Sequence, residues 1–99
     1  MAVLMENVVE QGTTDFYDAV NEKLGVDENP PAGMVVHIAM ARDGGGIRIV
    51  DVWESREAFE SFRDERLMPA IQAVAEENNI PMEGPPTHEF TEIHHLVKA

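Results

Sequence analysis

Two runs rich in β-branched residues flank a glycine-rich turn near the middle of the chain, and together they predict a β-hairpin. The first run reads MVVHIAMA at residues 34–41, and the second reads IRIVDVWE at residues 47–54. The segment Asp43-Gly44-Gly45-Gly46 lies between them and supplies the turn signal. The hairpin therefore defines two neighbouring antiparallel strands.

The hairpin also sorts its side chains into two faces. We expect a three-residue turn at residues 44–46, whereas a two-residue turn would scramble the partition. The expected pairs on one face are His37 with Trp53, Ala39 with Asp51, and Ala41 with Ile49. The other face is expected to be apolar, with Val36, Ile38, Met40, Val50 and Val52. Neither face is typical of one exposed to water, so we expect helices against one and a second sheet against the other.

The first quarter of the chain predicts a strand followed by a helix. Residues 2–10 are rich in valine, and the glycine that follows ends the run. Thr13 or Thr14 can cap the helix, because a threonine side chain accepts a hydrogen bond from the first turn. Apolar residues four apart then form one stripe of a helix, namely Phe16, Val20 and Leu24.

The second half of the chain predicts another helix and a last strand. Ser55 can cap the helix, and Pro69 interrupts it before opening its next stretch. The last strand is expected from about residue 88 to residue 97. The order βαββαβ is that of the ferredoxin-like α+β fold, in which right-handed crossovers place both helices on one face of a four-stranded antiparallel sheet. The Pro/Gly-rich connectors are short, so residues 1–99 are expected to form a single domain.

The charge balance and composition exclude several classes of function. Seven Lys and Arg residues against 19 Asp and Glu residues give a formal net charge of −12. This charge disfavours binding to nucleic acid and to anionic membrane surfaces. The absence of cysteine excludes disulfides and thiol chemistry. No long apolar run and no signal-peptide pattern are present, so a cytoplasmic location is expected.

The segment DVWESREAFESF at residues 51–62 resembles the dimeric α/β-barrel superfamily, and within it the antibiotic-biosynthesis-monooxygenase-like domain. In that family a strand ending in Trp-Glu-Ser runs directly into a helix that opens with Glu-Ala-Phe. The resemblance implies a homodimer whose two sheets pack face to face through the apolar hairpin face. It also implies a ligand cleft between the sheet and the helices of each subunit. The superfamily includes quinone-forming monooxygenases, haem-degrading enzymes, polyketide cyclases and isomerases, so the fold leaves the activity open.

The hairpin face that holds His37, Asp51 and Trp53 carries the candidate catalytic pair. Imidazole titrates near neutral pH, so His37 can act as a general base or acid, with Asp51 orienting it. The alternative is a buried neutral histidine bonded to Asp51 or to a backbone group. Trp53 is the only tryptophan and could stack on a planar substrate, or it could belong to the core and anchor the third strand to the second helix.

Three further residues are candidates for substrate binding. Asn7 interrupts an apolar strand, where a polar amide is costly unless it is bonded. The resemblance implies that Asn7 and Trp53 both face the cleft. Tyr17 could reach the cleft and donate a phenolic hydrogen bond, or it could lie at the rim of its helix. His94 could line the cleft or the dimer seam.

No metal, flavin or haem is expected at this site. His88, Glu92 and His94 fall on one side of the last strand, but the neighbouring His95 faces the other side, so the two adjacent histidines cannot easily share one ion. In the haem-degrading branch an axial histidine lies on the second long helix. Here that helix reads PAIQAVAE at residues 69–76 and has no histidine.

These observations predict a cofactor-independent enzyme, most simply a monooxygenase acting on a planar aromatic or polyketide-type substrate. His37 would be the base, Asp51 would orient it, and Asn7 and Trp53 would hold the ring and an oxyanion. A cyclisation or isomerisation that uses the same base fits the sequence equally well. The alternative is a non-catalytic small-molecule-binding or stress-associated dimer, in which His37 is structural.

Overall fold

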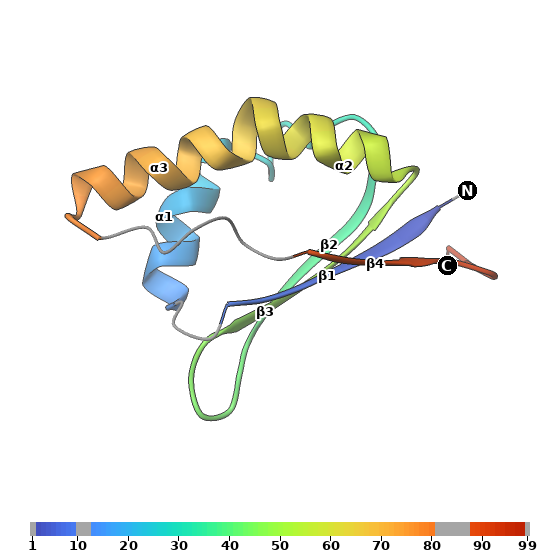
Figure 1. The fold of residues 1–99 in the computed structure, drawn as a ribbon, viewed down its shortest axis with the longest axis horizontal. Coiled ribbons are helices and arrows are strands. Elements are labelled where there is room, and N and C mark those ends of the chain that lie inside the picture. Colours follow the sequence, from blue (N-terminus) through green and yellow to red (C-terminus); the bar gives the residue numbers. More distant parts are fainter. Residues whose placement is uncertain (1, 10–12, 81–87, 99) are drawn as a thin grey trace.

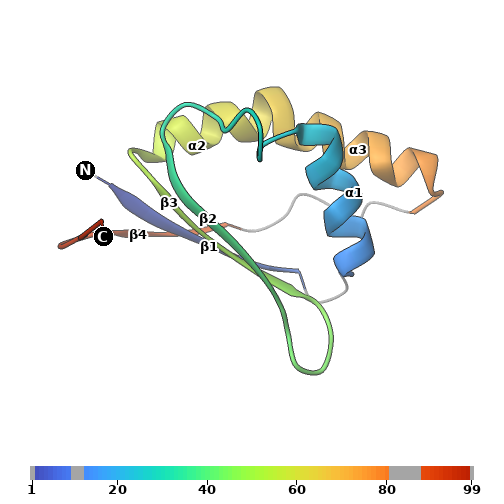
Figure 2. The ribbon, with the colours of Figure 1, turned by 180° about the vertical axis from the view of Figure 1, so that it is seen from behind.

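A four-stranded antiparallel sheet carries helices on one of its two faces (Figures 1 and 2). The computed structural model describes residues 2–9, 13–80 and 88–98. The strands are β1 (Val3–Val9), β2 (Met34–Ala41), β3 (Ile47–Trp53) and β4 (Glu89–Glu92). They lie in the order β2-β3-β1-β4 across the sheet, with every neighbouring pair antiparallel. The predicted ferredoxin-like arrangement is therefore confirmed.

Within the described residues, three α-helices and one π-helical segment lie on the helix side of the sheet. They are α1 (Thr14–Leu24), α2 (Arg56–Phe62), η1 (Arg63–Leu67) and α3 (Met68–Glu77). The side chains of Thr13 and Ser55 cap α1 and α2 by accepting backbone N–H groups at 3.1 Å, as the sequence predicts. None of the helices among the described residues is long and apolar enough to cross a membrane. A cytoplasmic location stays a prediction.

The predicted interruption at Pro69 takes the form of a π-helical turn. The segments α2, η1 and α3 follow one another in a single helical path along the sheet (Figure 1). Pro69 has no N–H to donate to the carbonyl one turn earlier. The backbone N–H of Met68 instead reaches the carbonyl of Arg63, five residues back. The wider turn of η1 therefore lets the helix continue through the proline.

The β2–β3 hairpin keeps the two predicted faces, but the predicted pairing is wrong by two residues. His37 lies opposite Asp51, where the sequence predicts Trp53. The backbone N–H of Arg42 donates to the carbonyl of Gly46 at 3.0 Å, so residues 43–45 make the turn rather than residues 44–46. The three consecutive glycines all have positive φ, so the glycine run itself does not select one turn position. The two faces are unchanged because a shift of two residues preserves the alternation of side chains.

The core lies between the helices and the sheet. Trp53 and Phe59 are the most deeply buried large side chains, at 0% and 1% exposure. The chain enters β2 at Gly33, where φ is 87° and an added Cβ would lie 2.7 Å from the Cβ of Ala58. Only glycine avoids both the strained φ and this close approach to α2.

The last strand is shorter than the sequence predicts. β4 ends at Glu92, whereas the predicted strand continues to residue 97. Its final ladder pair joins Glu92 to Val3, and the backbone N–H of Ile93 donates to the carbonyl of Ala2 at 3.0 Å. Because β1 begins at Val3, this register leaves no strand opposite the residues that follow Ile93.

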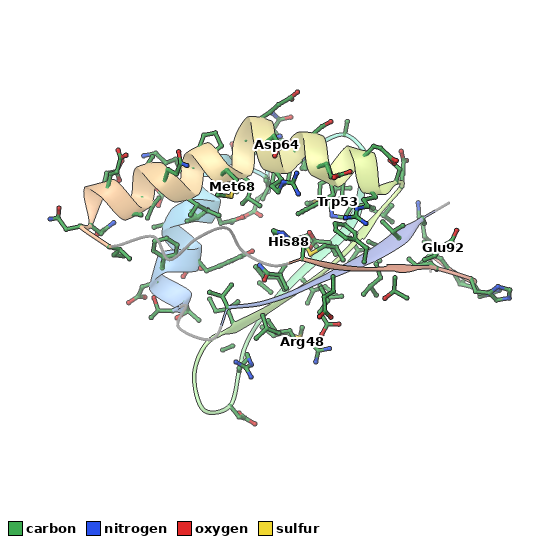
Figure 3. The ribbon with its side chains drawn as sticks, viewed as in Figure 1. Arg48, Trp53, Asp64, Met68, His88 and Glu92 are labelled. Atoms are coloured by element: carbon green, nitrogen blue, oxygen red, sulfur yellow. The ribbon has the colours of Figure 1, made fainter. Side chains whose placement is uncertain are left out.

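The second face of the sheet has no described helix against it (Figure 2). Apolar side chains on this face are 41–45% exposed, namely Val8, Val36, Ile38 and Met40. We call these four residues the open face. Arg48 projects on the same side of the sheet (Figure 3) and pairs with Glu6 at 2.7 Å. Arg48 lies between Val8 and Met40 in the strand pairing, so the contiguous apolar part of this face is on β2 and β3. Exposed apolar patches are typical of interfaces.

Candidate functional site

A chain of hydrogen-bonded side chains crosses the helix-facing side of the sheet from α1 through β2 to β3. The phenolic oxygen Oη of Tyr17 lies 2.6 Å from Nε2 of His37. The other ring nitrogen of His37, Nδ1, lies 2.6 Å from Oδ1 of Asp51. The indole N–H of Trp53 donates to the second carboxylate oxygen, Oδ2, at 3.1 Å. The structure thus joins the predicted catalytic pair to two of the predicted binding residues, and we call this arrangement the Tyr–His–Asp chain.

Strand pairing brings the centre of this chain together. His37 and Asp51 are direct partners in the β2–β3 ladder, where paired side chains on one face have Cβ atoms about 5 Å apart. Trp53 follows Asp51 by two residues and so lies on the same face. Tyr17 comes from α1, and its ring stacks near-parallel to the His37 ring, with centroids 6.1 Å apart and planes 12° apart. The alternation of side chains along a strand predicts that His37, Asp51 and Trp53 share a face. Their contact with Tyr17 depends on how α1 docks on the sheet.

The hydrogen-bond partners define one arrangement of protons for neutral His37. The Asp51 side chain is 4% exposed, and its Oδ2 accepts from the indole N–H of Trp53, which can only donate. With Asp51 ionised and His37 neutral, Nδ1 of His37 carries the ring proton and Nε2 accepts from the hydroxyl of Tyr17. Burial, and next the negative charge of Asp51, raises the pKa of Tyr17 above its ordinary value of 10.0. The phenol is consequently a donor at neutral pH.

Trp53 belongs to the core, which is the alternative that the sequence left open. Its ring is 0% exposed and packs against Phe59 and Phe62, with both pairs of centroids 5.5 Å apart. The polar end of the indole is directed at Asp51. A direct contact between Trp53 and a ligand stays a prediction, and in this structure the ring has no exposed surface to offer one.

A strip of the sheet beside the Tyr–His–Asp chain runs from an exposed residue on β2 to a buried one on β1. Ala39 follows His37 on the helix-facing side of β2, and it is exposed. It pairs with Ile49 of β3, which in turn pairs with Asn7 of β1. We call Ala39, Ile49 and Asn7 the floor. Ala39 is exposed and Ile49 is partly buried, so small and apolar side chains at these two positions suit contact with a flat ring. Asn7 at the far end is only 7% exposed, so its contact with a ligand stays a prediction.

His88 is a neighbour of the floor that sequence reasoning did not select as a binding residue. Position 88 comes one place beyond the Glu6–Glu89 pair of the β1–β4 ladder, which puts it beside Asn7. The His88 ring lies on the helix side of the sheet (Figure 3) and contacts Phe59 at a centroid distance of 4.8 Å. His88 is two residues before Phe90 of β4, and residues two apart on a strand point to the same face. This spacing is the sequence signal that places His88 on the helix side.

His94 does not join the Tyr–His–Asp chain. It follows the end of β4, and its side chain is exposed. No group of three or more His, Asp or Glu side chains in residues 2–9, 13–80 and 88–98 is placed to hold a metal ion. A role for His94 in binding and a site without metal or cofactor both stay predictions.

The His88→Gln variant is expected to lose less stability in acid than the parent protein. Burial lowers the pKa of His88 below its ordinary value of 6.5, and the charge of Arg63 lowers it further, while Asp51 acts in the opposite direction. The unfolded chain therefore takes up this proton at higher pH than the folded chain. The stability that depends on neutral His88 is present above about pH 6.5 and is lost as the pH falls below it.

Urea unfolding at about pH 7 and about pH 5 measures this effect as the difference between two unfolding free energies. Glutamine stays neutral at both values, so the difference should be smaller in His88→Gln. The exposed His95 provides the matched control, and His95→Gln should follow the parent protein. An equal acid loss in all three proteins would contradict the assignment to His88.

Comparison with known proteins gives matches among solved structures alone. No family model matches the chain, and no curated protein matches it. A conserved protein from Methanosarcina mazei Go1 superimposes with a TM-score of 0.65 at 7% identity, covering 92% of this chain and 91% of that chain. SnoaB, a cofactor-independent oxygenase from Streptomyces nogalater, superimposes with a TM-score of 0.62 at 12% identity, covering 99% of this chain and 97% of that chain.

A third solved structure supports the same fold. It is a candidate antibiotic biosynthesis monooxygenase from Chloroflexus aurantiacus J-10-fl, with a TM-score of 0.63 at 16% identity. The match covers 99% of this chain and 98% of that chain. Identities this low establish the fold and leave the activity to be argued from the site. The chain has the ferredoxin-like fold of the antibiotic-biosynthesis-monooxygenase-like proteins, which the Trp-Glu-Ser segment at residues 53–55 led us to expect.

Proposed function

We propose that the protein is a cofactor-independent oxygenase that acts on a planar phenol-type substrate. The Tyr–His–Asp chain is the observation that carries this proposal. It places the imidazole of His37 2.6 Å from the buried carboxylate of Asp51, and it lies beside the floor, where Ala39 is exposed. This arrangement of a base and an orienting carboxylate supports a role of the Tyr–His–Asp chain in proton abstraction.

The proposed reaction uses the substrate itself as the reductant. Loss of the phenol proton to the Tyr–His–Asp chain leaves an electron-rich phenolate. The phenolate reduces dioxygen, and oxidation of a monophenol ring position to a quinone inserts one oxygen atom and releases the other as water. The shared fold of SnoaB, which is described as a cofactor-independent oxygenase, supports this choice among the reactions that such a base can serve. Cyclisation or isomerisation would use the same base.

Non-catalytic binding of a small molecule is the second candidate. The complete burial of Trp53 favours it, because an aromatic group predicted to meet the substrate is instead packed in the core. In this alternative the floor would still hold a planar ligand, while the Tyr–His–Asp chain would serve only to stabilise the packing of α1 on β2.

Oxygen uptake with a panel of phenols and hydroquinones separates the two candidates. The oxygenase proposal expects consumption of dioxygen, with a matching amount of quinone detected by absorbance, and equal rates before and after treatment with a chelator. Binding of panel compounds without oxygen uptake, and without conversion to any isomer or cyclised product, would support the binding protein instead. A rate abolished by chelation would contradict the cofactor-independent reaction.

The proposal includes a homodimer in which two sheets pack through their open faces. Four apolar side chains on this face are more than 40% exposed in one subunit, and burying them in a partner gains about 25 cal/mol for each Å² of apolar surface. A second copy of the same face is a suitable partner, because self-complementary contacts about a two-fold axis are the commonest way in which subunits pair.

The Ile38→Glu variant is expected to convert this dimer into a monomer. Ile38 is the most exposed residue of the open face, and a carboxylate there would be buried against apolar side chains in the pair. Sedimentation velocity at micromolar concentration measures the change. Val97→Glu is the matched control, because Val97 is 73% exposed and lies outside the four strands. A parent protein that sediments as a monomer, or an Ile38→Glu variant that remains dimeric, would contradict this interface.

A further inference from the structure

Both ring nitrogens of His37 are already engaged, which limits how a substrate can reach this base. Nδ1 faces Asp51 and Nε2 faces the hydroxyl of Tyr17, each at 2.6 Å. In neutral His37 with its proton on Nδ1, the single free lone pair of the ring is on Nε2, which faces the hydroxyl of Tyr17. A substrate proton can therefore reach His37 only through the Tyr17 hydroxyl or after Tyr17 has moved away.

We propose that the hydroxyl of Tyr17 is the group that contacts the substrate and relays its proton to His37. The oxygen of Tyr17 donates its own proton to Nε2 and retains lone pairs that can accept from a ligand hydroxyl. This inference rests on the proposed function for the identity of the substrate as a phenol. It changes the role of His37 from the group that touches the substrate to the group that stores the proton.

The relay moves two protons and no electrons. The substrate O–H bond breaks as a new O–H bond forms on Tyr17. The original O–H bond of Tyr17 breaks as an N–H bond forms on Nε2 of His37. The products are a substrate phenolate and an imidazolium, and the carboxylate of Asp51 lies 2.6 Å from that ring to balance its charge. Tyr17 is neutral before and after the transfer.

The relay also supplies a donor for the substrate anion. Once His37 is protonated, its Nε2–H donates to the oxygen of Tyr17, and the phenolic proton is free to point at the phenolate. Burial and Asp51 raise the pKa of Tyr17, so this hydroxyl keeps its proton throughout the neutral range. The sequence assigns anion binding to Asn7 and Trp53, but the indole N–H of Trp53 is directed at Asp51.

The floor provides the place from which a phenol ring can reach Tyr17. Ala39 is exposed and comes next after His37 on the same face of β2. A ring lying over Ala39 and Ile49 would have its reacting hydroxyl at Tyr17. Asn7, two strand spacings or about 10 Å from β2, is 7% exposed, so the ring is placed over Ala39 and Ile49 alone.

The test uses 4-nitrophenol, because its neutral and ionised forms have different absorbance. At a pH below its own pKa, the parent protein is expected to bind the probe as the yellow phenolate. In Tyr17→Phe the relay has no hydroxyl, and the bound phenolate should fall at least tenfold while the probe stays bound in its neutral form. Phenylalanine keeps the ring that stacks on His37, so the fold is expected to be retained.

A second variant keeps the test decisive if Tyr17→Phe does not fold. Ala39→Trp fills the floor at an exposed position and should prevent probe binding, while the His37 ring nitrogens keep the ¹⁵N shifts of the parent protein. Val97→Trp, at a position 73% exposed, is the matched control and should bind the probe normally. The proposal expects Ala39→Trp to lose binding of the probe, so unchanged binding of the phenolate by this variant would overturn it.

Tyr17 is the only tyrosine of the chain, so 3-fluorotyrosine incorporated throughout the protein labels this position alone. Fluorine makes the phenol more acidic without removing the hydroxyl. The relay expects a ¹⁹F shift when the probe binds and a displaced pH profile of probe ionisation. A purely structural tyrosine would leave the pH profile unchanged, and that result would contradict the relay.

The outcomes distinguish the relay from the oxygenase reaction. Phenolate formation that depends on Tyr17, with no oxygen uptake from any phenol in the panel, would keep the relay and reject the oxygenase. Oxygen uptake that is unchanged in Tyr17→Phe would keep the oxygenase and reject the relay. A parent protein that binds 4-nitrophenol only in its neutral form, or not at all at millimolar concentration, would overturn the inference.

Discussion

The Asp51→Asn variant is expected to fold and to lose phenol turnover by about 10²- to 10⁴-fold. Asp51 accepts from the indole N–H of Trp53 on Oδ2, and its Oδ1 lies 2.6 Å from Nδ1 of His37, which donates to it in the arrangement described above. Asparagine has one acceptor oxygen and one amino group of donors. The donor-only indole of Trp53 will take the oxygen, and the amino group will then face His37. Nδ1 must therefore become the acceptor, which moves the ring proton to Nε2.

This tautomer has no base facing Tyr17, because Nε2–H would then donate to the phenolic oxygen. The imidazolium would also lack the adjacent carboxylate that stabilises it. Steady-state oxygen uptake measures the loss, and the ¹⁵N shifts of the His37 ring report the change of tautomer. Asp43→Asn is the matched control, because Asp43 lies in the exposed hairpin turn and makes the same change of charge. Turnover unchanged in Asp51→Asn, with the tautomer switched, would show that His37 is not the proton acceptor.

Replacing Trp53 with alanine is expected to lower the unfolding free energy by about 3–5 kcal/mol. The ring is fully buried and touches Phe59 and Phe62, so its removal leaves a cavity between β3 and α2 that neighbouring groups fill only in part. Domains of this size are stable by about 5–15 kcal/mol, so the loss is a large share of the total. Thermal unfolding should shift by about 4–8 °C for each kcal/mol lost.

Trp53→Phe separates packing from hydrogen bonding at the same position. Phenylalanine keeps an aromatic ring in the core but leaves Oδ2 of Asp51 without the indole donor. Loss of a hydrogen bond to a buried charged group costs about 1–3 kcal/mol, so this variant should lie between the parent protein and Trp53→Ala. Val97→Ala, at a position 73% exposed, should change little. All variants are compared at one protein concentration, because the proposed pairing of subunits would add to apparent stability. Equal losses in both Trp53 variants would mean that packing is not the main contribution of this ring.

Several features of the fold were accessible from the sequence because they arise from local periodicity. Thr13 and Ser55 cap their helices as their side-chain chemistry predicts. The alternation of side chains along β2 and β3 placed His37 and Asp51 on one face and the open face on the other, and the structure has the same division. The segment that runs from Trp53 into α2 indicated the family fold that the solved structures share.

The sequence by itself determined which residues share a face, since the side-chain period of a strand is a property of the backbone. Only the tertiary structure decided which of them touch. Three consecutive glycines allowed more than one turn position, so the direct pairing of His37 with Asp51 needed the folded sheet. The contact between Tyr17 and His37, and the burial of Trp53 under α2, depend on how the helices dock on that sheet. Docking is set by packing between elements distant in the chain, and no local pattern in the sequence encodes it.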